Sequence, residues 1–198
     1  MRRLLGIATA GLLVASAAQA QTVIVQAKCA GSGVYTEVGT WVDSSAESNL
    51  ANPCGQGSRS SRTPGDYAEF TPTVPVAGMY SVSVCWGVFQ QAGGTNKGAN
   101  SENVAYTITD SYGNSNAVLN QRGQNGCPNT NADIWQPLGT AYFTPAGGGS
   151  IRITNTANGQ CHNGSSKRYV NVDAVRLAYE GPTPVNPVSW GTIKVRHR

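Results

Sequence analysis

Charged residues are scarce in this chain. They make up 12% of its 198 residues, and only two residues are histidines. Basic residues form no cluster, so the sequence lacks the cationic face that nucleic-acid binding requires. It contains no Cys-x-x-Cys pair and no glycine loop that leads into a helix, which excludes the usual zinc and phosphate-binding motifs. We therefore expect no metal and no cofactor.

Long apolar runs are also missing, apart from one at the N-terminus between Leu4 and Ala18. This run follows two arginines and ends in the small residues Ala18-Gln-Ala20, as a cleavable secretory signal does. Its length of about 15 residues is below the ~20 that span a bilayer. The sequence predicts a signal peptide over residues 1–20, no membrane span, and a secreted protein that is periplasmic, extracellular or attached to a surface.

The formal charge of +4 comes from the two ends of the chain. Residues 21–182 contain nine basic and ten acidic residues, a net charge of −1. The pattern of the domain stops after Tyr179, where a Pro-rich stretch leads to a basic, Trp-bearing terminus. We expect three parts: the signal peptide, a folded domain over residues 21–180, and a linker with a tail over 181–198.

The chain is rich in short segments that alternate between apolar and polar residues, each followed by a turn dense in Gly, Asn, Ser and Pro. Such alternation buries one face of a strand, and no helical period competes with it. The pattern predicts an all-β fold, an antiparallel, jelly-roll-like β-sandwich in a single domain. The predicted strands are Tyr67–Thr71, Tyr80–Val84, Val104–Ile108, Ala117–Gln121, Ser150–Thr154 and Val170–Ala174.

Several short motifs follow one another between Thr22 and Tyr179. They are Gly39-Thr-Trp41-Val-Asp43, Tyr67-Ala-Glu-Phe-Thr-Pro72, Pro75-Val-Ala-Gly-Met-Tyr80-Ser-Val-Ser-Val84, Ala105-Tyr-Thr-Ile108, Leu119-Asn-Gln121, Trp135-Gln-Pro-Leu-Gly139, Ala141-Tyr-Phe143, Ile151-Arg-Ile-Thr-Asn155 and Val172-Asp-Ala-Val-Arg-Leu177. In this order the chain resembles the golvesin C-terminal domain, also found appended to xanthan lyase and other secreted polysaccharide-active enzymes. The resemblance implies a β-sandwich that accompanies carbohydrate chemistry, and it transfers no catalytic residue.

Five cysteines lie beyond the predicted signal, an odd number for an oxidising compartment. Two disulfides and one odd cysteine can be arranged in several ways. We favour Cys127 with Cys161, which flank the last strands in polar loops, and then Cys29 with Cys54. Cys85 is then the odd residue and a candidate for an intermolecular disulfide.

Residues for catalysis are available, but their spacing does not pair them. His162 stands in an Asn-Gly-Ser loop, and no Gly-x-Ser-x-Gly context surrounds a serine. Glycosidic cleavage needs two facing carboxylates, and spacing cannot say which would face one another. The carboxylates considered are Asp43, Asp66, Glu69, Glu102, Asp110, Asp133 and Asp173. Asp110-Ser-Tyr-Gly-Asn114 resembles a calcium loop, but a tight hairpin turn explains the same residues better.

Sugar binding needs exposed aromatic rings beside polar groups. Most aromatic residues fit the core of a sandwich, which leaves three that packing explains least: Phe89, Tyr112 and Tyr169. Gln121 and Arg122 could add polar contacts. These five residues are our predicted carbohydrate-binding set.

The sequence favours a secreted, non-catalytic module that binds a polysaccharide or another extracellular or cell-surface polymer. A structural or adhesive protein of the cell surface or matrix is the alternative, and a small polysaccharide lyase or hydrolase is less well supported.

Overall fold

The computed structural model describes residues 21–28, 31–44, 58–87, 100–121, 134–156 and 169–182. The predicted signal peptide and the basic tail from residue 183 onward lie outside this part of the chain. Within the described residues every regular element is a β-strand, and none is a helix that could span a membrane.

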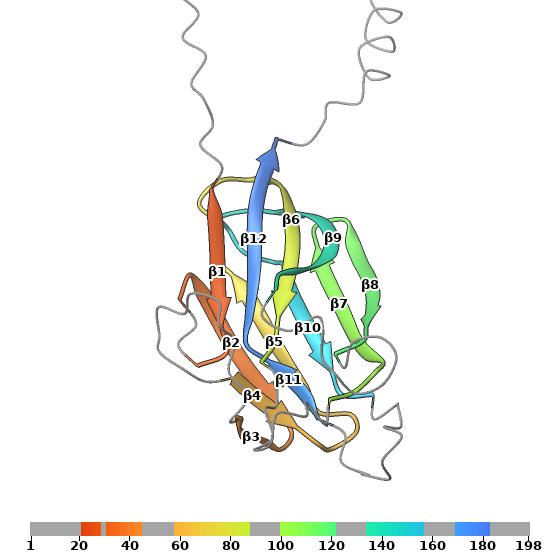
Figure 1. Ribbon diagram of the computed structural model, residues 1–198. Helices are drawn as coiled ribbons and strands as arrows, with labels where there is room; N and C mark the ends of the chain where they lie inside the picture. The colour runs from red at the N-terminus through yellow and green to blue at the C-terminus, as the bar shows by residue number, and fades with distance from the viewer. Residues whose placement is uncertain are drawn as a thin grey trace, which may run out of the picture.

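Two antiparallel sheets face each other (Figure 1), which confirms the predicted β-sandwich. The four-stranded sheet has the order β1 (Thr22–Gln26), β12 (Ala174–Gly181), β6 (Gly78–Cys85) and β9 (Gln136–Phe143). The five-stranded sheet has the order β2 (Gly33–Val38), β5 (Tyr67–Pro72), β10 (Ser150–Thr154), β7 (Val104–Asp110) and β8 (Gly113–Leu119).

A third, smaller sheet closes one end of the sandwich, the lower end in Figure 1. Its strands are β11 (Val170–Val172), β4 (Ser58–Ser61) and β3 (Trp41–Ser44). The chain passes from this sheet into the four-stranded sheet at Asp173. There the backbone bonds Ala27 N–H to Asp173 O at 2.7 Å and Asp173 N–H to Cys85 O at 3.3 Å.

Two predicted strands differ from the structure. We expected one strand over Val170–Ala174, but it breaks at Asp173 because the chain changes sheets there. We also expected a strand over Ala117–Gln121. It runs instead over Gly113–Leu119, because β8 starts directly after the hairpin turn and pairs with β7 along its whole length.

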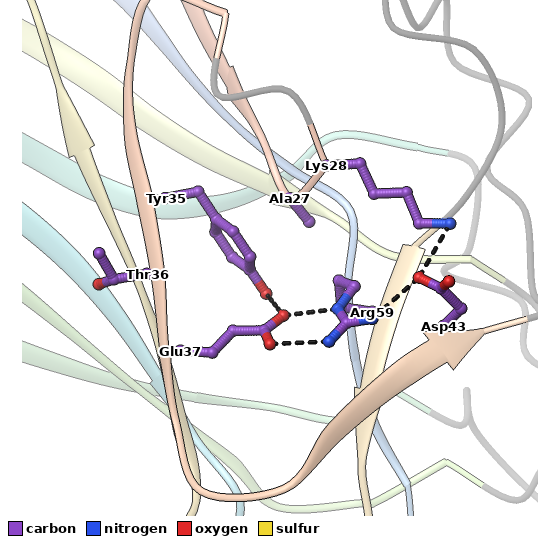
Figure 2. Close-up of a pocket in the computed structure, with 7 residues that line it drawn as sticks. All are labelled: Ala27, Lys28, Tyr35, Thr36, Glu37, Asp43 and Arg59. Carbon is purple, nitrogen blue, oxygen red and sulfur yellow. Dashed lines mark hydrogen bonds and ion pairs between the residues drawn. The ribbon is translucent and has the colours of Figure 1, made fainter.

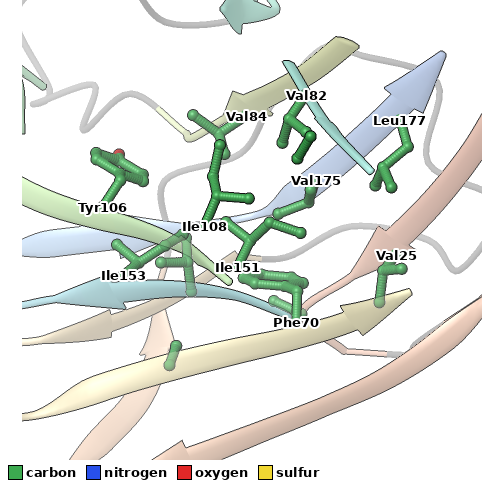
Figure 3. Packing of buried hydrophobic residues seen from close by; sticks show 14 of the residues in the cluster. Val25, Phe70, Val82, Val84, Tyr106, Ile108, Ile151, Ile153, Val175 and Leu177 are labelled. Atoms are coloured by element: carbon green, nitrogen blue, oxygen red, sulfur yellow. The ribbon is translucent and has the colours of Figure 1, made fainter. Parts of the chain in front are cut away.

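The apolar core lies between the two large sheets, and alternate residues of each strand enter it. Val82 and Val84 of β6 and Leu177 of β12 come from one sheet, while Phe70 and Ile151 come from the other (Figure 3). All five are 1% exposed or less. The predicted alternation of buried and outward residues is therefore confirmed in β5, β7 and β10.

The two ends of the folded part lie side by side. Strands β1 and β12 pair antiparallel, with Thr22 opposite Ala178, and Tyr179 N–H donates to Gln21 O at 2.9 Å. Both ends leave the sandwich on the side opposite the three-stranded sheet, and the β7–β8 turn lies on that same side (Figure 1).

One buried carboxylate fixes the corner between the large and the small sheet. Asp66 accepts hydrogen bonds from Thr40 N–H at 2.8 Å and from the Ser61 hydroxyl at 2.6 Å. Its backbone carbonyl accepts from Asn155 N–H at 2.8 Å. Gly39 turns the chain beside it with φ of 98°, a conformation that favours glycine.

We predict that Gly39→Ala lowers the free energy of unfolding by about 3 kcal/mol, because the new methyl group adds backbone strain and overlaps the Asp66 carboxylate. Gly65→Ala is the matched control, since Gly65 has φ of 88° and nothing within 4 Å of an added Cβ. In Gly65→Ala only the added backbone strain should lower the free energy of unfolding, by about 1 kcal/mol. Urea denaturation measures both; equal losses would show that the Asp66 corner carries no special stability.

Candidate functional site

An open pocket of about 380 Å³ lies where the five-stranded sheet meets the small sheet. Its polar side chains come from different elements: Lys28 follows β1, Tyr35 and Glu37 stand on β2, Asp43 on β3 and Arg59 on β4 (Figure 2). Ala27 and Thr36 complete the lining. Tyr35 and Glu37 are two residues apart on a strand, so they point to the same face.

Arg59 is the centre of this pocket. Its Nε and Nη2 donate to the two carboxylate oxygens of Glu37 at 2.6 and 2.8 Å, a bidentate pair. Its Nη1 donates to Oδ1 of Asp43 at 2.9 Å, and Nη2 also reaches the backbone oxygen of Trp41 at 3.1 Å. One guanidinium group therefore joins the small sheet to the edge strand of the five-stranded sheet.

The same contacts set the protonation of the pocket. Hydrogen bonds from Arg59 and then Lys28 lower the pKa of Asp43, while the hydrogen bond to Glu37 raises the pKa of Arg59. Burial, with the 2.7 Å hydrogen bond that the Tyr35 hydroxyl donates to Glu37, raises the pKa of Tyr35. Two cations face two carboxylates, so the pocket is charged but electrically balanced.

A second candidate lies at the β7–β8 turn, where Tyr112 is 71% exposed. Its backbone N–H donates to Oδ1 of Asp110 at 2.8 Å, and the other oxygen, Oδ2, accepts from Tyr142 N–H at 2.9 Å. The rings of Tyr112 and Tyr142 lie 5.4 Å apart and are tilted by 52°. Asp110 thus holds the turn and β9 together and places the exposed Tyr112 beside the half-buried Tyr142.

The hairpin interpretation of Asp110–Asn114 is confirmed, since Asp110 pairs with Gly113 across the turn. Sequence reasoning did not select Tyr142. The signal was available in Ala141-Tyr-Phe143, where Tyr142 falls between two buried residues and therefore faces outward. What the sequence could not supply is the long-range hydrogen bond that places it beside Tyr112.

The other predicted binding residues lie elsewhere. Gln121 is fully buried: its amide group donates to the Tyr106 hydroxyl at 2.9 Å and to Asn171 O at 2.7 Å, and it accepts from Asn171 N–H at 2.9 Å. Tyr169 is buried with the Arg62 guanidinium 4.2 Å from its ring centroid. Both side chains are used inside the domain. Phe89 and Arg122 lie outside the described residues.

Four of the five cysteines, Cys29, Cys54, Cys127 and Cys161, also lie outside the described residues, so the predicted disulfides stay predictions. Cys85 ends β6 and is 2% exposed. An intermolecular disulfide through Cys85 would therefore require the sheet to open locally. The structure lends this predicted contact no support.

Fold and surface together define a β-sandwich module with an exposed aromatic pair at one end and a balanced charged pocket at the other. The chain belongs to the Golvesin C-terminal domain family, whose model matches residues 23–179. This match confirms the resemblance seen in the sequence motifs.

Relatives of known identity cover the same region. A xanthan lyase of Bacillus sp. (strain GL1) is 27% identical over 159 residues, which are 77% of this chain and 14% of the relative. The structure of Paenibacillus xanthan lyase matches with a TM-score of 0.59 and 30% identity, over 81% of this chain and 13% of that one. The present chain therefore corresponds to a small part of these proteins.

A family 35 carbohydrate-binding module from Clostridium thermocellum matches more distantly, with a TM-score of 0.42 and 17% identity over 79% of this chain and 97% of that one. A likeness at this level carries no conclusion about ligands.

We predict that Glu37→Gln lowers the free energy of unfolding by about 2 kcal/mol, because it leaves Arg59, whose side chain is 21% exposed, without its bidentate partner. Asp43→Asn is the matched control in the same pocket. The Asp43 side chain is 71% exposed, and exposed ion pairs contribute little, so its urea midpoint should equal that of the parent protein. If Asp43→Asn lowered the free energy of unfolding more than Glu37→Gln, the assignment of Glu37 as the structural partner of Arg59 would be contradicted.

Proposed function

We propose that this chain is a secreted, non-catalytic module that binds a polysaccharide through the exposed tyrosine pair. The observation that carries the proposal is Tyr112: a large aromatic ring at a hairpin tip, 71% exposed, held at a fixed angle against Tyr142. Tyr112 is not part of the apolar core, where aromatic rings such as Phe70 and Tyr80 are fully buried. Core packing therefore does not explain its position.

The geometry suits a sugar ring. Pyranose rings have an apolar C–H face, and a tyrosine offers an apolar ring of similar size together with a polar hydroxyl group. The backbone bonds to Asp110 hold the turn in place before any ligand arrives, so little conformational entropy would be lost on binding. A rigid aromatic surface of this kind is what polysaccharide binding requires.

The relatives agree with this function. Two proteins with matching regions are xanthan lyases, named for a polysaccharide, and the matching region is 13–14% of their length. A short region that recurs within long polysaccharide-active enzymes is consistent with an accessory binding role.

Four of the seven carboxylates considered for catalysis support a non-catalytic role. Asp66 and Asp110 hold backbone corners, Glu69 binds Arg152 at 2.9 Å, and Asp43 bridges Arg59 and Lys28. Each is engaged by its own chain, whereas glycosidic cleavage needs an acid and a base or nucleophile that face the substrate. The predicted signal peptide over residues 1–20 adds the expectation that the module works outside the cytoplasm.

Native affinity electrophoresis of the oxidised mature protein tests the proposal, with gels that contain galactomannan, mixed-linkage β-glucan, alginate or xanthan. We expect retardation by at least one polymer. Tyr112→Ala should weaken that binding about tenfold, because one stacked ring contributes on the order of 1–2 kcal/mol.

Two variants serve as controls. Tyr112→Phe keeps the ring and should retain most of the retardation. Val118→Ala removes another exposed apolar side chain, 64% exposed, from the far end of β8 and should change nothing. Retardation by none of the polymers, or equal retardation of Tyr112→Ala and the parent protein, would refute binding through this surface.

A further inference from the structure

The described strands around Tyr112 contain no basic residue. Strands β7, β8 and β9 and the turn after β9, residues 144–149, contain neither lysine nor arginine. Exposed side chains here are uncharged: Asn114, Asn116 and Thr140 are polar, and Val118 is apolar. The one carboxylate of these strands and this turn is Asp110, which accepts hydrogen bonds from the backbone N–H groups of both tyrosines.

Asp110 makes this surface unfavourable for an acidic sugar. Its two oxygens accept hydrogen bonds from the backbone of Tyr112 and Tyr142, but backbone N–H groups do not neutralise its charge. A uronic acid or other carboxylate stacked on Tyr112 would meet this negative charge with no cation on β7, β8 or β9 to offset it.

Cations elsewhere on the described residues are already engaged. Lys28 and Arg59 are balanced by Asp43 and Glu37 in the charged pocket, and Arg152 binds Glu69. The two other basic side chains of this part of the chain lie over aromatic rings, Arg62 over Tyr169 at 4.2 Å and Arg176 over Trp135 at 4.8 Å. An acidic polymer would have to displace one of these partners to gain an ion pair.

Polar, uncharged side chains also stand on the outer face of β8. On β8, Asn116 lies opposite Thr107, and the Thr107 hydroxyl donates to Oδ1 of Asn116 at 2.9 Å. This bond orients the amide and leaves its NH₂ group as a donor to a sugar hydroxyl. Asn114 continues the same side of the strand, because residues two apart share a face.

We propose that the Tyr112 surface is selective for a neutral glycan and discriminates against polymers that carry carboxylates, xanthan included. This inference rests on the proposed polysaccharide binding and adds the ligand class. Selectivity arises because the described strands beside Tyr112 carry no compensating cation, so it should respond directly to a change of charge there.

The parent protein is compared in gels with two neutral polymers, galactomannan and mixed-linkage β-glucan, and two acidic ones, alginate and xanthan. We expect retardation by a neutral polymer only, with an affinity that changes less than about twofold from about 50 to about 500 mM NaCl, because screening does not affect uncharged contacts. Retardation by an acidic polymer alone, or by both classes equally, overturns the neutral selectivity while polysaccharide binding stands. Retardation by none refutes both.

A charge series at Ser111, the exposed neighbour of Tyr112 in the turn, tests the cause. Ser111→Lys should acquire retardation by alginate that disappears at about 500 mM NaCl. Ser111→Asp, the matched control, should not acquire it, and both should keep neutral binding within about twofold. If alginate does not retard Ser111→Lys, the missing cation is not what excludes acidic polymers, and the inference fails.

Discussion

The whole molecule depends on one constraint: two sheets must share a single apolar layer. Every strand that contributes to it has to place alternate side chains inward, and a slip of one residue would turn them all outward. Strand β6 shows the effect, because it pairs on both sides and buries Tyr80, Val82 and Val84 together. Polar groups are consequently confined to the outer faces and the ends, which is where both candidate sites lie.

The two ends of the sandwich accommodate their polar side chains differently. At the small sheet, polar side chains are drawn inward and satisfied there: Asp66 holds backbone groups, Gln121 bridges Tyr106 and Asn171, and Arg59 is surrounded by oxygens. At the β7–β8 turn, Asp110 is the polar side chain that binds backbone groups in this way, and the Tyr112 ring stays in solvent. The first end gains rigidity, and the second keeps a surface available for a ligand.

The sequence predicts the parts of the fold that alternation controls. It does not reveal β4, Ser58–Ser61, because this strand has no apolar residue and its serines are buried by the sheets around it. Nor does it reveal β9, whose Pro137 and Gly139 are typical of loops; the strand lies at a sheet edge and is bulged, where both residues are tolerated.

The candidate site follows the same division. The exposure of Tyr112 follows from a local turn, which sequence patterns describe well. Its contact with Tyr142 joins residues 30 positions apart through Asp110, and such a long-range hydrogen bond leaves no local signal. The burial of Gln121 was missed for a related reason: its hydrogen bonds to the backbone of Asn171 join residues 50 positions apart and leave no local signal.

The adjacent ends of the folded part have a consequence for how this module can be combined with other chains. Because Gln21 and Tyr179 are hydrogen-bonded neighbours, the domain could be placed within a surface loop of a host protein without forcing the two sides of that loop apart. Both ends also leave the sandwich at the end where the β7–β8 turn lies (Figure 1). A host joined there would lie at the same end of the sandwich as the tyrosine pair, so a ligand bound at that end would meet the host at a high local concentration.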